Sequence, residues 1–228
     1  MGELAGWRTS FAALGVLSLV VLASLYIAVP PLPPLQVTKP AVLRDAPGGS
    51  RDALIVTCLI VTAHFATYTY VTPFLRDVVR PELIGLFLLI YGAAGLVGNL
   101  AAGTAAARNL SLTFAACAGL IATATLLMPV VGRSTARALV LLVVWGLGYG
   151  GIPVCSLSMF AKAAPRSREA ATVPFTSSFQ AVLSIGALLG GLVVDAWSVS
   201  AAMVCGGLCA ALTVGVPLWA RTQEVLGT

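Results

Sequence analysis

Residues 83–106 read LIGLFLLIYGAAGLVGNLAAGTAA, an apolar stretch without a charged side chain. At about 1.5 Å per residue, a helix of this length crosses a hydrocarbon core of roughly 30 Å. Unpaired backbone N–H and C=O groups are too costly in lipid, so such a stretch is predicted to be a helix. Including this one, the chain contains seven comparable stretches, at residues 11–29, 53–75, 83–106, 111–131, 137–161, 171–194 and 199–220.

The charged residues gather in the short gaps between these stretches. Asp, Glu, Lys and Arg make up 9% of the chain, hydrophobic residues make up 59%, and the mean hydropathy is +0.99. A soluble domain does not need so apolar a composition. The leader before Phe11 lacks the basic cluster of a signal peptide, so the first stretch is expected to be retained. The sequence therefore predicts an all-α, polytopic transmembrane helix bundle with about seven spans.

The longest polar stretch, residues 30–52, divides the chain. It opens with Pro30-Pro31-Leu32-Pro33-Pro34, which cannot continue a helix because proline lacks the N–H group. It ends near Gly48-Gly49-Ser50, which predicts a flexible end. We expect a single transmembrane helix at 1–29, a cytoplasmic linker at 30–52 and a six-helix transmembrane bundle at 53–228.

Basic residues near the span ends predict the orientation. If the N-terminus is outside, the inner side carries Lys39, Arg44, Arg51, Arg108, Lys162, Arg166, Arg168 and Arg221, and the outer side carries Arg8, Arg76, Arg80, Arg133 and Arg137. This excess favours an outer N-terminus and a cytoplasmic C-terminus. The net charge of +5 is therefore explained by the basic residues at the span ends, which set the membrane topology. No nucleic acid partner is expected.

The residue types argue against catalysis, metal binding and disulfide bonding. The chain has five cysteines, all inside predicted spans, and an odd, dispersed set does not form a disulfide framework. It has a single histidine, no HExxH motif and no acidic residue inside a span, so it lacks a catalytic or metal-ligating set. Both lysines, Lys39 and Lys162, lie at loops, which excludes a retinal photoreceptor. We expect no enzyme, no metal and no cofactor.

Several motifs resemble a known transporter family. The most specific is His64-Phe65-Ala66-Thr67-Tyr68-Thr69-Tyr70-Val71-Thr72-Pro73-Phe74-Leu75-Arg76. It is joined by Gly6-Trp7-Arg8-Thr9-Ser10-Phe11, Tyr91-Gly92-Ala93-Ala94-Gly95-Leu96-Val97-Gly98-Asn99-Leu100, Trp145-Gly146-Leu147-Gly148-Tyr149-Gly150 and Ala164-Pro165-Arg166-Ser167-Arg168-Glu169-Ala170. Together they resemble the sixth to twelfth spans of a major facilitator superfamily transporter, closest to bacterial drug:proton antiporters and sugar or nucleoside efflux permeases.

This resemblance implies a function, a location and partners. The full-length form would export a small solute from the cell across the bacterial inner membrane, by alternating access with proton antiport. Its partners would be the lipid bilayer and the solute. The resemblance also implies that about five spans precede Met1, so that the chain is a C-terminal half with one extra helix. The alternative is a non-transporting fragment, or a subunit that pairs with a complementary N-terminal half.

His64 is the main candidate for solute contact. It lies at the centre of the stretch 53–75, and its unperturbed pKa of about 6.5 would allow a change of charge in the physiological range. Thr57, Val61, His64 and Tyr68 follow the spacing i, i+4, i+7 and i+11, so they share a helix face that suits a cavity wall. Three roles stay open for His64: solute binding together with Tyr68, proton carriage, and a hydrogen bond that holds the bundle together.

Two further side chains suit a cavity wall. Gln180 lies near the middle of the stretch 171–194, a depth at which family members often present polar residues to the solute, and an interhelical hydrogen bond is the alternative. Tyr149 lies in Gly146-x-Gly148-x-Gly150-Gly151-x-Pro153, where the glycines and the proline predict a bend in a gating helix.

Small residues predict close helix contacts and one gating loop. Asn99 lies between Gly95 and Gly103 on a face of small residues, and a bond across a helix contact is favoured over solute contact. Gly186 and Gly190 form a GxxxG packing pair. The segment from Gly103 to Arg108 resembles the family's gating loop, but Ala107 replaces its usual acidic residue. Arg108 therefore lacks its ordinary ion-pair partner.

We predict that this chain alone does not drive proton antiport. No Asp, Glu, Lys or Arg lies at mid-depth in any predicted span, and in proton-coupled relatives the coupling carboxylates commonly belong to the first half. The measurement is solute efflux from proteoliposomes that contain the purified chain and an imposed pH gradient. Sustained uphill efflux driven by that gradient would contradict the prediction.

Overall fold

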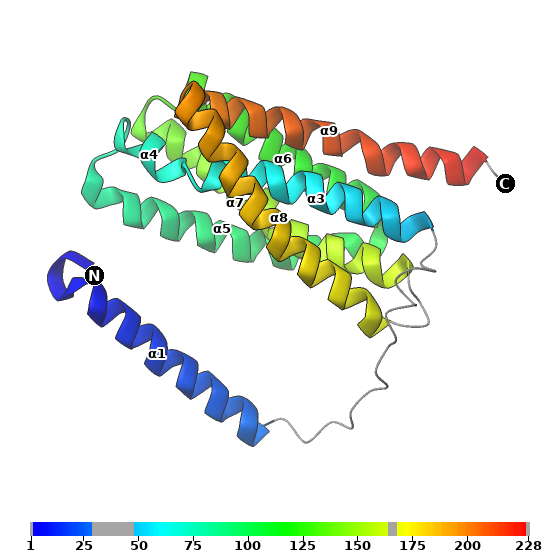
Figure 1. The fold of residues 1–228 in the computed structure, drawn as a ribbon, viewed down its shortest axis with the longest axis horizontal. Coiled ribbons are helices and arrows are strands. Elements are labelled where there is room, and N and C mark those ends of the chain that lie inside the picture. Colours follow the sequence, from blue (N-terminus) through cyan, green and yellow to red (C-terminus); the bar gives the residue numbers. More distant parts are fainter. Residues whose placement is uncertain (1, 29–47, 164–167, 227–228) are drawn as a thin grey trace. The chain divides into compact units, whose positions relative to one another are not determined.

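The computed structural model describes residues 2–28, 48–163 and 168–226, which form helices and short connections (Figure 1). The chain falls into two compact units, Met1–Thr38 and Lys39–Thr228. The first contains helix α1 (Gly2–Ala28). The proline run at 30–34 and the loop residues 164–167 lie outside the described residues.

The second unit is built from helices alone in its described part. These helices are α3 (Gly48–Tyr68), α4 (Val71–Arg76), α5 (Pro81–Arg108), α6 (Leu110–Val131), α7 (Thr135–Ala163), α8 (Arg168–Ala196) and α9 (Val199–Leu226). Five segments are long and apolar enough to cross a membrane: Ala53–Arg76, Pro81–Arg108, Leu110–Val131, Thr135–Lys162 and Phe179–Ala196. Two shorter apolar helices, Ala12–Ala28 and Val199–Gly215, correspond to the first and last predicted stretches. The all-α membrane bundle is confirmed.

The predicted span 53–75 is confirmed as Ala53–Arg76, but its helix is interrupted near the end. α3 ends at Tyr68, and α4 begins at Val71 after a turn at Tyr70 with φ −107° and ψ 9°. Pro73 has no N–H to donate to the carbonyl of Thr69, and its ring clashes with the preceding turn. The proline therefore divides the span into a long helix and a short one.

Gly48-Gly49-Ser50, which the sequence places at the end of the linker, form the first residues of α3. The N–H groups of this first turn have no partner within the helix. The apolar span itself begins at Ala53, as predicted.

A single residue connects α5 with α6. Asn109 has extended backbone angles, φ −151° and ψ 93°, and its N–H donates to the carbonyl of Ala105 at the end of α5. Its side-chain Oδ1 accepts from the N–H of Leu112 at 3.1 Å and so caps the start of α6. The backbone of Asn109 thus bonds to the end of α5 and its side chain bonds to the start of α6. A connection of one residue is therefore sufficient between the two helices.

The helix contacts show an internal repeat. α7 packs against α3, α5, α6 and α8, and α3 packs against α7, α8 and α9 (Figure 1). The helices α3, α5 and α6 correspond in order to α7, α8 and α9. Under this correspondence the contact of α5 with α7 is equivalent to the contact of α8 with α3. The contact of α6 with α7 is likewise equivalent to the contact of α9 with α3. Each repeat has three long helices that run in alternating directions, so the second repeat begins at the opposite end of the bundle from the first. The two repeats are therefore inverted, an arrangement typical of secondary transporters.

The contact between α5 and α7 brings the two backbones together. A Cβ atom on Gly150 would overlap the carbonyl of Gly95, and a Cβ atom on Gly98 would overlap the carbonyl of Leu147. The Nδ2 group of Asn99 donates to the carbonyl of Gly150 at 3.1 Å, which confirms the predicted bond across a close helix contact. Gly103 lies outside this contact, because nothing approaches the position of its Cβ within 4 Å.

The equivalent contact between α8 and α3 also uses glycines. A Cβ atom on Gly186 would come within 2.9 Å of the carbonyl of Thr62, and a Cβ atom on Gly190 would overlap the carbonyl of Ala66. The predicted GxxxG packing pair is thus confirmed, and α8 lies directly against α3.

We predict that Gly150→Ala lowers the thermal stability of the purified protein. The added methyl group meets backbone atoms that cannot rotate away, and overpacking of this kind costs about 1–3 kcal/mol. Gly92→Ala is the matched control, since nothing lies within 4 Å of its Cβ position and alanine favours a helix. Equal unfolding midpoints for the two variants in detergent would contradict the close contact.

Candidate functional site

Aromatic rings from four helices meet in the middle of the second unit. Their members are His64, Phe65 and Tyr68 from α3, Tyr91 from α5, Trp145 and Tyr149 from α7, and Phe179 from α8. We call this set the aromatic cluster. His64 lies midway along the span Ala53–Arg76, and Tyr149 lies midway along Thr135–Lys162. Both residues therefore stand near the centre of their spans.

The glycine-rich part of α7 directs its aromatic residues toward α3. Cβ positions on Gly146 and Gly150 point at the backbone of α5, and the Cβ position on Gly148 lies 2.8 Å from the carbonyl of Cys117 on α6. Trp145 and Tyr149 are four residues apart, so they share the remaining face of the helix. The rings of both residues contact the ring of His64.

The imidazole of His64 lies between two tyrosine rings. The centroid of the Tyr149 ring is 3.4 Å away at an interplanar angle of 5°, and that of Tyr68 is 5.2 Å away at 16°. The His64 side chain is 1% exposed, whereas Tyr68 and Tyr149 are half-buried. The two tyrosines are therefore the more accessible members of the stack, and His64 is its buried member.

A hydrogen bond from Trp145 determines the state of the His64 ring. The indole Nε1–H of Trp145 donates to Nδ1 of His64 at 3.1 Å. An accepting nitrogen carries no proton, so the neutral ring must carry its proton on Nε2. A proton added to Nδ1 would face the indole N–H and break this bond. The arrangement favours a neutral histidine whose Nε2–H can act as a donor.

Three buried hydroxyl groups near these helices have no hydrogen-bond partner among the described residues. They belong to Tyr91 in the cluster, and to Thr57 and Ser156 on α3 and α7. By contrast, Thr67, Thr125 and Ser158 bond to a carbonyl in the preceding turn. Thr57 and Ser156 are fully buried, and buried polar groups without a protein partner commonly bond to an internal water molecule.

The structure brings three of the predicted site residues together. His64, Tyr68 and Tyr149 form one stack. Gln180 is exposed on α8, next to Phe179, whose ring contacts Phe65 at a centroid distance of 6.4 Å. A solute-contacting role for these residues stays a prediction, as does the bend expected at Pro153, which lies inside α7.

Gly103 and Arg108 lie away from the cluster, in the last two turns of α5. Both residues are exposed, and within the described part of the chain Arg108 forms no ion pair. As the last residue of α5, Arg108 places its positive charge at the negative end of the helix dipole. Their gating role stays a prediction.

Sequence reasoning missed Trp145 as the hydrogen-bond partner of His64. The signal was the spacing of Trp145 and Tyr149, which places both aromatic residues on one helix face opposite the glycines. It was not sufficient to identify the partner, because His64 is 81 positions away in the chain. Phe65 was missed for the same reason.

The described residues contain no group of three His, Cys, Asp or Glu side chains that could hold a metal ion. All five cysteines are free thiols. The aromatic cluster therefore offers tyrosine ring faces and hydroxyl groups to a ligand.

Residues 1–174 match the family model described as Major Facilitator Superfamily. The matched region includes α1 and α3 to α7, and it ends within α8.

We predict that Trp145→Phe lowers the unfolding free energy by about 1–3 kcal/mol beyond the loss of packing, because Nδ1 of His64 becomes a buried acceptor without a donor. In a His64→Phe background the same substitution should cost at least about 1 kcal/mol less. Chemical unfolding of the four proteins gives this coupling. Trp197→Phe is the control, since Trp197 is 73% exposed. A coupling of zero would contradict the hydrogen bond.

Proposed function

The chain belongs to the Major Facilitator Superfamily, and we propose that it carries a small solute across the membrane with the aromatic cluster as part of the solute-contacting wall. The observation that carries this proposal is the stack of Tyr68, His64 and Tyr149 near the centres of two spans. Substrate sites of secondary transporters lie near the bilayer midplane, between repeats. The stack lies where α3 of one repeat faces α7 of the other.

The chemistry of the cluster favours a neutral or weakly cationic solute. Tyrosine rings offer faces for stacking and for weak attraction of cations. The half-buried Tyr68 and Tyr149 also carry hydroxyl groups that can bond to polar groups of the solute. No Asp, Glu, Lys or Arg occurs within the cluster, so an anion would find no countercharge there. Drugs, sugars and nucleosides of an efflux substrate range all fit this description.

Proton coupling would need an acidic group from outside the cluster. Nδ1 of His64 accepts a hydrogen bond from Trp145, so the ring cannot take up a proton on Nδ1 without losing that bond. Efflux by proton antiport therefore depends on a carboxylate that the cluster does not contain. We propose that such a group comes from a complementary part of the transporter, and that His64 has a positioning role.

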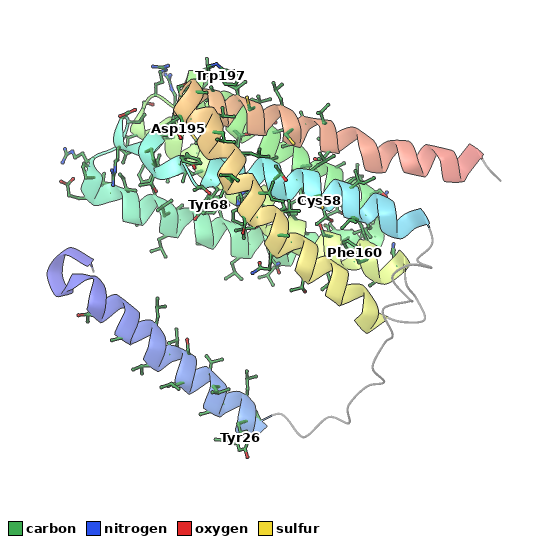
Figure 2. All side chains as sticks on the ribbon, viewed as in Figure 1. Tyr26, Cys58, Tyr68, Phe160, Asp195 and Trp197 are labelled. Atoms are coloured by element: carbon green, nitrogen blue, oxygen red, sulfur yellow. The ribbon has the colours of Figure 1, made fainter. Side chains whose placement is uncertain are left out.

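The proposed orientation has the N-terminus outside and the C-terminus in the cytoplasm of a bacterial cell. Basic residues are more frequent at the end of the bundle that would face the cytoplasm. In this orientation α4 and the turn between α8 and α9 lie at the outer surface. Figure 2 shows Asp195 and Trp197 together at that turn.

Equilibrium binding to the purified chain tests the proposal without a proton gradient. A neutral nucleoside, a neutral sugar, an amphipathic weak base and an organic anion serve as radiolabelled probes. We expect at least one of the first three to bind, and Tyr149→Ala to weaken its binding about tenfold, which corresponds to about 1.4 kcal/mol. Truncation removes the stacking surface and uncovers His64.

The matched control is Tyr26→Ala, which removes a tyrosine that is 89% exposed on α1. It should leave binding unchanged. Unchanged binding in Tyr149→Ala, or binding of the organic anion alone, would contradict the proposed site.

A further inference from the structure

Two buried thiols meet between α6 and α7. Cys117 lies on α6 and Cys155 on α7, and both belong to the core of the second unit, with exposed fractions of 6% and 0%. Their side chains form a hydrogen bond with each other, and both are free thiols. The aromatic cluster includes neither residue, so the proposed transport site leaves this pair without a role.

Glycines of α7 create the room for this pair. A Cβ atom on Gly151 would lie 2.5 Å from Sγ of Cys117, and a Cβ atom on Gly148 would lie 2.8 Å from the carbonyl of Cys117. The backbone of α7 therefore contacts Cys117 directly. Cys155 comes four residues after Gly151, so its side chain lies on the same face of α7 and leans back toward the turn that contains Gly151. The helix geometry and the hydrogen bond thus agree in placing the two sulfur atoms side by side.

Cys205 and Cys209 on α9 are arranged differently. The thiol of Cys209 donates to the carbonyl of Leu59 at 3.6 Å. Residues four apart on one helix have Cβ atoms about 5–6 Å apart, whereas a disulfide needs about 3.5–4.5 Å. Cys205 is exposed, so it would react first with an oxidant if exposure alone determined reactivity. The arrangement of the thiols therefore favours Cys117 and Cys155 as partners in a disulfide.

We propose that Cys117 and Cys155 form an oxidisable pair, which hydrogen peroxide converts into a disulfide between α6 and α7. One sulfur attacks a peroxide oxygen, the O–O bond breaks, and the thiol proton leaves with the other oxygen as water, which gives a sulfenic acid. The second sulfur then attacks the sulfenic sulfur, and the hydroxyl group leaves with the second thiol proton as water. The two sulfur atoms lose two electrons, and one peroxide is reduced to two water molecules.

This reaction suits a buried position because its reactants and its product are uncharged. Hydrogen peroxide is neutral and little larger than water, and a disulfide carries no charge that an apolar core would penalise. The hydrogen-bonded neighbour also captures the sulfenic acid before a second peroxide can oxidise it further. The bridge joins α6 of one repeat to α7 of the other, and α7 carries Trp145 and Tyr149 of the aromatic cluster.

The test counts thiols in the full purified chain in detergent. The reduced protein is treated with hydrogen peroxide, unfolded and labelled with N-ethylmaleimide, and the labels are counted by intact mass spectrometry. We expect peroxide to lower the number of labels by two, and subsequent reduction with dithiothreitol to restore it. Peptide mapping of the oxidised protein should identify one bridge, between Cys117 and Cys155.

Serine substitutions separate the pair from the other cysteines. Cys117→Ser and Cys155→Ser should each abolish the bridge and leave the remaining thiol of the pair as a sulfenic acid that reacts with dimedone. Cys205→Ser is the matched control, because it removes an exposed thiol, and peroxide should still remove two labels.

An unchanged number of labels, a loss of label at Cys205 alone, or a bridge that includes Cys58 or Cys209 would overturn the proposal. If the serine variants do not fold, the bridge mapped in the unsubstituted protein decides the matter by itself.

Discussion

The close approach of α5 and α6 to the glycines of α7 is the contact on which the rest of the site depends. Glycines 146 and 150 admit the backbone of α5, and Gly148 admits that of α6. Because the backbones of α5 and α6 contact two faces of α7 directly, large side chains of α7 fit only on its remaining face. Trp145 and Tyr149 therefore point toward α3, and their rings meet His64 near the centre of its span.

This geometry also explains why a histidine can be buried in the bundle. A polar ring without partners would cost several kcal/mol in an apolar environment. Trp145 satisfies Nδ1, and the ring faces are covered by Tyr149 and Tyr68. The cluster is thus both a packing element and a surface with defined hydrogen-bonding capacity. That combination suits the solute-contacting wall that we propose.

The sequence predicted the helices well because their cause is local. Apolar length alone indicates a span, and Asn99 on a face of small residues correctly predicted a bond across a helix contact. The break before Val71 was not anticipated, although Pro73 supplied its cause. Tertiary partners were harder to predict. The helix face containing His64 was recognised, but its contact with Trp145 depends on how α7 rotates against α5. Gln180 is exposed on α8, and its predicted contact with the solute stays a prediction.

The most direct measurement is the protonation state of His64 in a lipid bilayer. Because the chain has a single histidine, uniform ¹⁵N-histidine labelling reports on this ring alone. We predict a neutral ring with its proton on Nε2, and a magnetisation transfer from the indole N–H proton of Trp145 to the labelled Nδ1, consistent with the N–N separation of 3.1 Å. Trp145→Phe should abolish the transfer. A ring protonated on Nδ1 in the unsubstituted protein would contradict the account.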